Sequence, residues 1–122
     1  MNWRKYYKMP LRLDDWGHMV WDSKNTHALD FNDKTTTEYM QEQIVDAINE
    51  EGGYRISNLS VEDGVDFYKD GEYIFCVRGW GYLTGTCKLP LEEAAKVQDE
   101  FVDFIFEKLT NHETPPYNPL GR

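Results

Sequence analysis

The chain has 122 residues, a length that suits one domain whose core needs neither metal nor disulfide to hold it together. Its 13 basic and 22 acidic residues give a net charge of −9, which disfavours direct nucleic-acid binding because that binding needs lysine and arginine against phosphates. No apolar run approaches the roughly 18 residues that span a bilayer. We therefore expect a cytoplasmic protein without membrane contact, with Cys76 and Cys87 as free thiols.

The first third of the chain predicts short strands. Residues 3–13 alternate loosely between apolar and polar side chains and contain Pro10, a pattern typical of an extended arm or an edge strand. Two short β-rich runs, 18–22 and 26–31, flank a polar turn. These runs predict a first hairpin.

A helix is predicted to follow this hairpin. Thr35 and Glu38 are three residues apart, the spacing of a capping box at a helix start. Apolar residues then recur at helical spacing from Met40 to Ile48. We expect the glycines of Gly52–Gly53 to end the helix by taking a left-handed backbone conformation.

The second half of the chain repeats this order of elements. Residues 54–61 are predicted to be extended. The β-rich runs 65–69 and 72–77 flank Asp70-Gly71, a dipeptide that favours a tight turn with positive φ. This is the clearest hairpin signal in the chain, and a glycine-rich segment and a second helix are predicted after it.

The second helix is predicted to begin at Pro90, which a first helical turn tolerates, and to run to Leu109. Its apolar face is wider than one sheet needs. The residues that widen it are Phe101, Val102, Phe104, Ile105 and Phe106. Either the helix lies between the sheet and a neighbouring element, or part of it forms a homodimer contact. Residues 111–122 contain three prolines and are expected to form an irregular C-terminal tail.

The two halves of the chain resemble each other. Their hairpins align at an offset of 47 residues and their helices at an offset of 57, so the second half carries about ten extra residues, Gly79–Lys88. We therefore predict an α+β fold: an antiparallel sheet from two β-hairpin–helix (ββα) repeats plus flanking strands, with both helices packed on one face. Repeat 1 covers about residues 11–53 and repeat 2 about 54–110, within a single domain formed by residues 1–110.

The glycine-rich segment Gly79–Lys88 is the first candidate site. It lies between a strand and a helix, as phosphate-binding loops do, but its glycines match neither GxxxxGK[ST] nor GxGxxG. It is either a wide turn or packed strand, or a loop that binds a partner. Arg78, Trp80 and Tyr82 belong to the residue types that dominate protein interfaces, and we predict that they contact a protein partner.

The second candidate site is an acidic stripe. Four acids recur every four residues in and after the first predicted helix: Glu38, Glu42, Asp46 and Glu50. On a helix this spacing forms one row with about 6 Å between neighbours. The row is either a solvated outer face, or a surface that mimics a row of phosphates and occupies the basic groove of a nucleic-acid-binding protein. We include the four acids among the predicted partner-binding residues.

No catalytic or metal-binding motif is present, and we predict no catalytic residue, metal or cofactor. His18 and His27 flank the first turn at nearly equal distances and can face each other across the hairpin, but they lack a definite third ligand. Cys76 lies in an apolar strand run and is expected in the core. The alternative to a binding protein is a small enzyme or ligand-binding domain with a pocket near Gly79–Lys88.

Two stretches resemble small uncharacterised proteins of bacteriophages and mobile elements in gut bacteria. They are GWGYLTG followed by LEEAAKVQDEFVDFIFEKL, and HMVWDSKNTHALDF with a helix that ends in VDAINEEG. The resemblance spans about residues 11–110 and implies a viral or integrated-element setting, with no residue role to transfer. We expect a non-enzymatic accessory or inhibitor protein whose partner is a protein, in the sharper version a basic, nucleic-acid-binding one.

Overall fold

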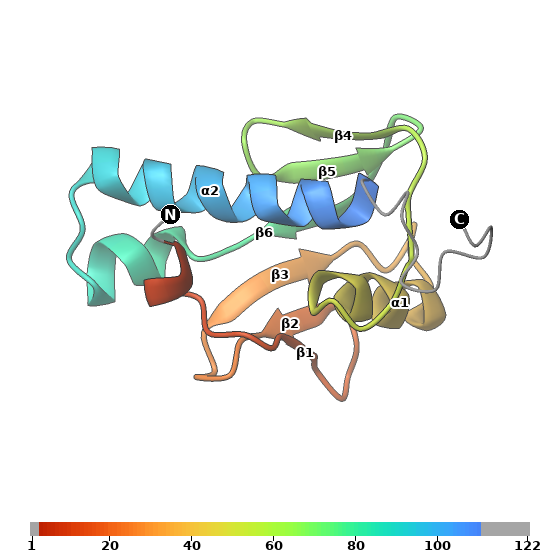
Figure 1. Cartoon of the computed structure of the whole chain (residues 1–122), viewed down its shortest axis with the longest axis horizontal. Helices are drawn as coiled ribbons and strands as arrows, with labels where there is room; N and C mark the ends of the chain where they lie inside the picture. The colour runs from red at the N-terminus through yellow and green to blue at the C-terminus, as the bar shows by residue number, and fades with distance from the viewer. Residues whose placement is uncertain (1–2, 111–122) are drawn as a thin grey trace, which may run out of the picture.

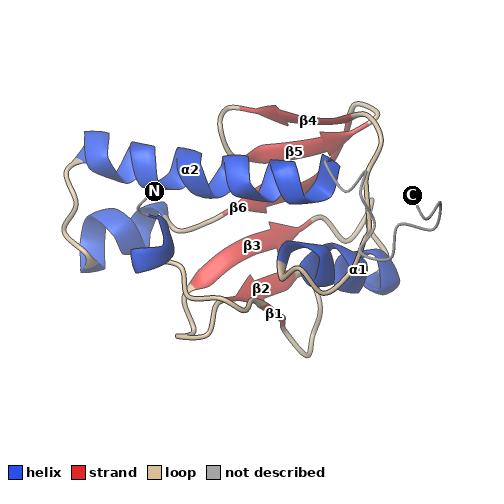
Figure 2. Ribbon diagram, in the orientation of Figure 1, coloured by secondary structure: helices blue, strands red, loops and turns tan. Residues whose placement is uncertain are grey.

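The computed structural model describes residues 3–110, which form one six-stranded antiparallel sheet with two α-helices and confirm the α+β class (Figures 1 and 2). The strands are β1 (Arg12–Leu13), β2 (Met19–Trp21), β3 (His27–Phe31), β4 (Leu59–Glu62), β5 (Asp66–Lys69) and β6 (Glu72–Val77). The helices are α1 (Glu38–Ile48) and α2 (Leu91–Thr110), with a 3₁₀ helix η1 (Trp3–Lys5) and a π-helical turn η2 (Tyr82–Thr86). The predicted tail, residues 111–122, lies outside the described residues.

The sheet consists of two three-stranded meanders, β1-β2-β3 and β4-β5-β6, joined where β3 pairs with β6. Each predicted hairpin is therefore present and is extended by a further strand. Asp70 (φ 53°) and Gly71 (φ 82°) form the predicted tight turn between β5 and β6, since both take positive φ. The order of the strands places β1 and β4 at the two edges of the sheet.

Each meander contains a β-bulge between its second and third strands. The pairing of β2 with β3 shifts between Val20 and Trp21, and that of β5 with β6 shifts between Phe67 and Tyr68. A bulge adds one residue to one strand and increases the local twist. Strand β3 and the last five residues of β6 also share the same order of buried and half-buried positions.

Helix α1 begins later than the capping-box pattern predicts. Its N-cap is Thr37, whose hydroxyl accepts the backbone N–H of Met40 (3.1 Å). The Thr35 hydroxyl instead donates to the carbonyl of Tyr73 in β6 (2.6 Å), so a tertiary contact removes it from the cap. The predicted glycine stop is also wrong, because Glu50 (φ 67°) takes the left-handed conformation after the helix.

The N-terminal arm packs into the core and is a strand only at Arg12–Leu13. Trp3 and Tyr7 are 1% and 0% exposed. Tyr7 stacks on Phe101 of α2 with ring centroids 3.9 Å apart, and its hydroxyl donates to the carbonyl of Arg78 (2.8 Å). The arm therefore ties α2 to the end of β6.

A buried carboxylate ties the same arm to the first hairpin. Asp22 is fully buried. Its oxygens accept three backbone N–H groups, each at 2.8 Å, from Lys8, Lys24 and Thr26. A buried N–H left unpaired costs about 1–3 kcal/mol, so Asp22 has a structural role.

The Gly79–Lys88 segment is not a strand. Its central part is the π-helical turn η2, anchored by the fully buried side chain of Leu83. Gly79 (φ 132°) makes room for the N-terminal arm, because a Cβ atom there would lie 2.0 Å from the Tyr7 hydroxyl. The packed-strand interpretation of this segment is therefore wrong, and a turn is present.

In the view of Figure 1, α2 is seen in front of β5 and β6, and α1 lies at the right-hand ends of β2 and β3. The side chains that α2 buries are Ala94, Val97, Gln98, Phe101, Val102, Ile105 and Leu109. Phe104, from the predicted wide face, packs on Trp3 with ring centroids 4.6 Å apart. Within residues 3–110, no helix has the length and apolar character needed to cross a membrane.

Gly79→Ala is expected to destabilise the protein by about 1–3 kcal/mol, because the residue must keep a φ of 132° and its new methyl group would collide with the Tyr7 hydroxyl. Gly81→Ala is the matched control, since Gly81 has a φ of −62° and open space at its Cβ position. The control should change stability by less than about 0.5 kcal/mol. Urea unfolding measures both variants, and equal effects would contradict the packing of the arm on Gly79.

Candidate functional site

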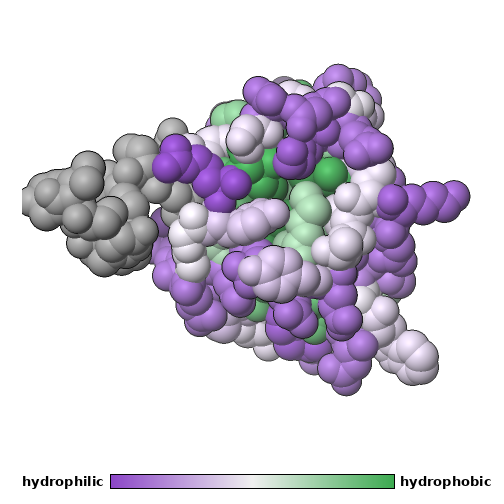
Figure 3. Space-filling model, turned by 90° about the vertical axis from the view of Figure 1, so that its right-hand side faces the viewer, coloured by the Kyte–Doolittle hydropathy of each residue, from purple (hydrophilic) through white to green (hydrophobic). Residues whose placement is uncertain are grey.

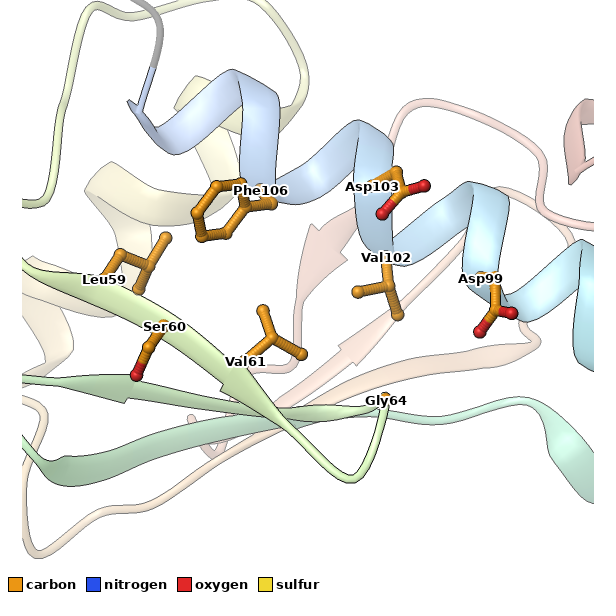
Figure 4. Close-up of a pocket in the computed structure, with 8 residues that line it drawn as sticks. All are labelled: Leu59, Ser60, Val61, Gly64, Asp99, Val102, Asp103 and Phe106. Atoms are coloured by element: carbon orange, nitrogen blue, oxygen red, sulfur yellow. The ribbon is translucent and has the colours of Figure 1, made fainter.

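A groove of about 540 Å³ lies between the edge strand β4 and helix α2. It is lined by Leu59, Ser60, Val61 and Gly64 from the strand side, and by Asp99, Val102, Asp103 and Phe106 from the helix. Figure 4 shows Leu59 and Phe106 pointing toward one another, and Val61 facing Val102. The groove therefore has an apolar floor contributed by both elements.

The rim of the groove is acidic. Asp99 and Asp103 are exposed on α2, while β4 and α2 each contribute one buried and one half-buried apolar side chain to the floor. No lysine or arginine of the described residues lines the groove. The end of the molecule at which α2 stops has a similar character, with hydrophobic residues near the centre of the face and hydrophilic ones around them (Figure 3).

Strand β4 is an edge strand that pairs only with β5 among residues 3–110. The carbonyl of Asn58 accepts the N–H of Asp70 (3.2 Å), which identifies the positions whose backbone faces β5. Because this direction alternates along an antiparallel strand, the N–H and C=O groups of Leu59 and Val61 point away from β5. Unpaired backbone groups and an apolar groove therefore lie next to each other.

The opposite edge of the sheet has a corresponding, smaller groove. It lies between β1 and α1 and has a volume of about 250 Å³. Here the side-chain amide of Asn49 satisfies the backbone of Leu11, because it accepts the N–H and donates to the C=O of that residue, both at 2.8 Å. Glu42, Val45 and Asp46 of α1 and its C-cap Asn49 line this groove, and each aligns with a lining residue of α2 at the offset of 57.

The predicted loop residues are only partly brought together. Arg78 forms an ion pair with Asp30 on β3 (3.2 Å), and the Tyr82 hydroxyl accepts a hydrogen bond from the ammonium group of Lys24 (3.1 Å). Trp80 is 42% exposed. Arg78 and Trp80 line a pocket of about 390 Å³ to which Tyr82 does not contribute. The three residues therefore do not line one pocket together.

The predicted acidic stripe keeps three of its four members on α1. Glu38 and Glu42 are exposed, and Asp46 is half-buried. Glu50 lies beyond the end of the helix and forms an ion pair with Lys108 of α2 (3.2 Å). The stripe is therefore shorter than the four-residue spacing predicts.

The two hairpin histidines do not face each other. His27 lies opposite Trp21, whereas the carbonyl of His18 accepts the N–H of Phe31. Burial lowers the pKa of His27, so its ring is neutral at pH 7. Within residues 3–110, no group of three or more His, Cys, Asp or Glu side chains is placed to hold a metal ion.

Cys76 is half-buried on β6, and its chemistry follows from that position. Burial raises the pKa of the Cys76 thiol to about 11, and a hydrogen bond and charge from Asp66 act in the same direction. The thiol also lies 3.3 Å from the carbonyl oxygen of Val77. A thiol with this pKa is protonated near neutral pH and is a poor nucleophile.

Sequence reasoning missed the floor of the β4–α2 groove. Leu59 and Val61 lie in a stretch predicted only to be extended, and nothing in the pattern identifies it as an edge. The available signal is the wide apolar face of α2, which includes Val102 and Phe106. The width of that face predicts that α2 contacts something besides the sheet, but it does not indicate where on the molecule.

Comparison with protein-family models, with curated proteins and with solved structures gave no match for this chain. The function of the groove is therefore inferred from its own geometry. The observations that bear on it are the apolar floor, the acidic rim and the open edge of β4.

Iodoacetamide should alkylate Cys76 slowly at pH 8, because a pKa of about 11 leaves about one thiol in a thousand ionised. The rate should keep rising up to about pH 11, whereas an ordinary cysteine with a pKa of about 8.5 levels off much earlier. Mass spectrometry of the Cys87→Ser variant follows Cys76 alone. A rate that levels off below about pH 9 would show that the thiol is not buried as described.

Proposed function

We propose that this protein acts without catalysis, by binding another protein through the groove between β4 and α2. The observation that supports this most directly is the partly covered apolar floor beside an unpaired edge strand. Covering apolar surface gains about 25 cal/mol per Å², so such a groove favours a partner. The charges of Asp99 and Asp103 favour a partner with basic residues at the contact.

A duplicated origin of the fold also belongs to this proposal. The two bulges, at Val20–Trp21 and Phe67–Tyr68, are related by the hairpin offset of 47. Both helices bury a glutamine, Gln41 and Gln98, at the helix offset of 57. These features support two ancestral copies with both helices on one face. Because each meander has three strands, the proposed repeat consists of three strands and a helix instead of two strands and a helix.

The setting in this proposal is a bacteriophage or mobile element, with a host protein as the partner. The sequence resemblance supports the setting, and the acidic helices support the choice of a basic partner. In the sharper version the partner is a nucleic-acid-binding protein, and exposed acids imitate phosphates. The exposed acids on the two helices include Glu38, Glu42, Asp99, Asp103 and Glu107. A homodimer through α2 would compete for the same groove.

A small-ligand site beside Gly79–Lys88 is the second candidate. The pocket of about 390 Å³ favours it, because that volume suits a small molecule. Two of its functional groups are not available, however, since Arg78 pairs with Asp30 and the raised pKa of Cys76 keeps that thiol protonated. The pocket therefore supplies shape without a reactive group, and we prefer the groove.

Affinity purification of the tagged protein from its native host should capture a protein partner, and Phe106→Glu should remove that partner by placing a charge on the groove floor. Leu91→Glu is the matched control, because Leu91 lies on the same helix, is 66% exposed and does not line the groove. Quantitative mass spectrometry compares the captured amounts. Hydrogen exchange with the purified partner should then show protection in residues 59–64 and 99–106.

Two results would contradict this proposal. One is equal capture of the partner by the unmodified protein and by Phe106→Glu. The other is protection confined to residues 78–82, which would move the contact to Arg78, Trp80 and Tyr82. Loss of the partner in Leu91→Glu as well would show a general effect of added charge on α2.

A further inference from the structure

We propose that the partner binds as an extended segment that adds a seventh strand to the sheet at β4; this inference rests on the groove being the binding site proposed above. The segment places an apolar side chain against the Phe106 end of the groove. It places lysine or arginine side chains toward Asp103 and Asp99.

The outer side of β4, which no other strand of residues 3–110 pairs, is the first support. The N–H and C=O groups of Leu59 and Val61 point outward from the sheet. A helix lying in the groove would leave these groups unpaired, because its own backbone groups are bonded internally. An added strand pairs them, and its alternate side chains fill the neighbouring groove. The edge carries neither lysine nor proline, the residues that usually prevent strand addition.

The first half of the chain shows how such an edge can be closed. Leu11 directly precedes β1 and lines the groove beside α1, and Asn49 satisfies both its N–H and its C=O at 2.8 Å. At the offset of 57, the α2 residue in place of Asn49 is Phe106. Leu11 and Leu59 each line the groove on their side of the sheet. A phenyl ring neither donates nor accepts these bonds, so Phe106 does not close the backbone of Leu59 as Asn49 closes that of Leu11. The N–H and C=O groups of Leu59 therefore need an acceptor and a donor that lie side by side, and an extended backbone supplies both.

The spacing of the rim predicts the order of side chains in the segment. Along α2, Asp103 and Asp99 lie about 4.5 Å and about 10.5 Å from the level of Phe106, from a rise of 1.5 Å per residue. Side chains on one face of a strand recur about every 6.8 Å. An apolar residue at Phe106 therefore brings the next two same-face residues near Asp103 and then Asp99. Lysine and arginine stems can cover the apolar floor while their charges reach the rim.

The same charges disfavour a second copy of this chain as the occupant. Each copy carries a net charge of −9. Pairing of two β4 edges would bring two acidic rims together, with Asp99 and Asp103 contributed by each copy. Like charges at an interface are destabilising, so the complementary occupant is a basic segment of another protein.

A blocked heptapeptide, Thr-Leu-Thr-Lys-Thr-Lys-Thr, is the probe for this proposal. Titrated into the full-length protein, it should shift the backbone amide NMR signals of Leu59 and Val61. Replacing both lysines with glutamate should weaken binding at least tenfold, and added salt should weaken binding of the lysine peptide. A glutamate peptide that binds as tightly as the lysine peptide would overturn the proposal.

Backbone methylation tests the strand itself. One peptide carries N-methyl groups at its leucine and lysines, and the other at its inner threonines. Successive N–H groups of a strand point to opposite sides, so one methylated peptide should bind at least tenfold more weakly than the other. Weaker binding by the peptide methylated at its leucine and lysines indicates an antiparallel added strand, and weaker binding by the peptide methylated at its threonines indicates a parallel one. Equal binding by both would overturn strand addition.

Phe106→Asn tests the comparison between the two edges. The new amide is expected to pair with Leu59 as Asn49 pairs with Leu11, which closes the groove and weakens peptide binding at least tenfold. Leu91→Asn is the control and should bind as the unmodified protein does. Circular dichroism checks that both variants are folded. A folded Phe106→Asn variant with unchanged peptide affinity would overturn the proposal.

The failures of the two proposals can be separated. Phe106→Glu can remove the captured partner while the peptide leaves the NMR signals of Leu59 and Val61 unchanged. The groove then binds protein in another way, and only the proposal of strand addition is rejected. If capture survives Phe106→Glu, the proposed function itself falls. Signals of Leu59 and Val61 that move with protein concentration in the absence of peptide would identify a second copy at the edge and overturn the basic segment.

Discussion

The pairing of β3 with β6 is the interaction on which the rest of this structure depends. It joins two meanders of short strands into one sheet, with Asp30 opposite Cys76 and Phe31 opposite Phe75. Three short strands alone offer little area for a helix to cover, whereas six strands carry a common core. Because the junction uses the third strand of each meander, the first strand of each must become an edge. The positions of both grooves follow from that single pairing.

An open edge beside an apolar groove is a liability as well as a site, since exposed edges pair with one another. The acidic rim changes which molecules can use this edge. Asp99 and Asp103 border the groove, and the whole chain carries a charge of −9, so copies of the chain repel each other there. In the proposed function the same field attracts a basic partner, so charge would both protect the edge from self-association and select the occupant.

Local sequence patterns predict the elements of this fold better than their arrangement. The turn at Asp70-Gly71 needs only positive φ, a property of those two residues, and it is present. The start of α1 depends on which threonine is free to cap it, and Thr35 is taken by the carbonyl of Tyr73, far along the chain. The groove depends on strand order and on which strand lies at an edge, and no local pattern records either. Only the wide apolar face of α2 hints at it.

The ten extra residues of the second half draw attention in the sequence, but much of that segment serves packing. Gly79 gives space to the Tyr7 hydroxyl, and the side chain of Leu83 in η2 is fully buried. The difference that bears on binding is smaller: an asparagine closes the first edge, and Phe106 stands at the matching position of the second. Removing one amide leaves a pair of backbone groups open, and adding a ring gives them an apolar neighbour. On the proposed duplication, a binding edge would arise where a closing side chain is lost, without any new loop.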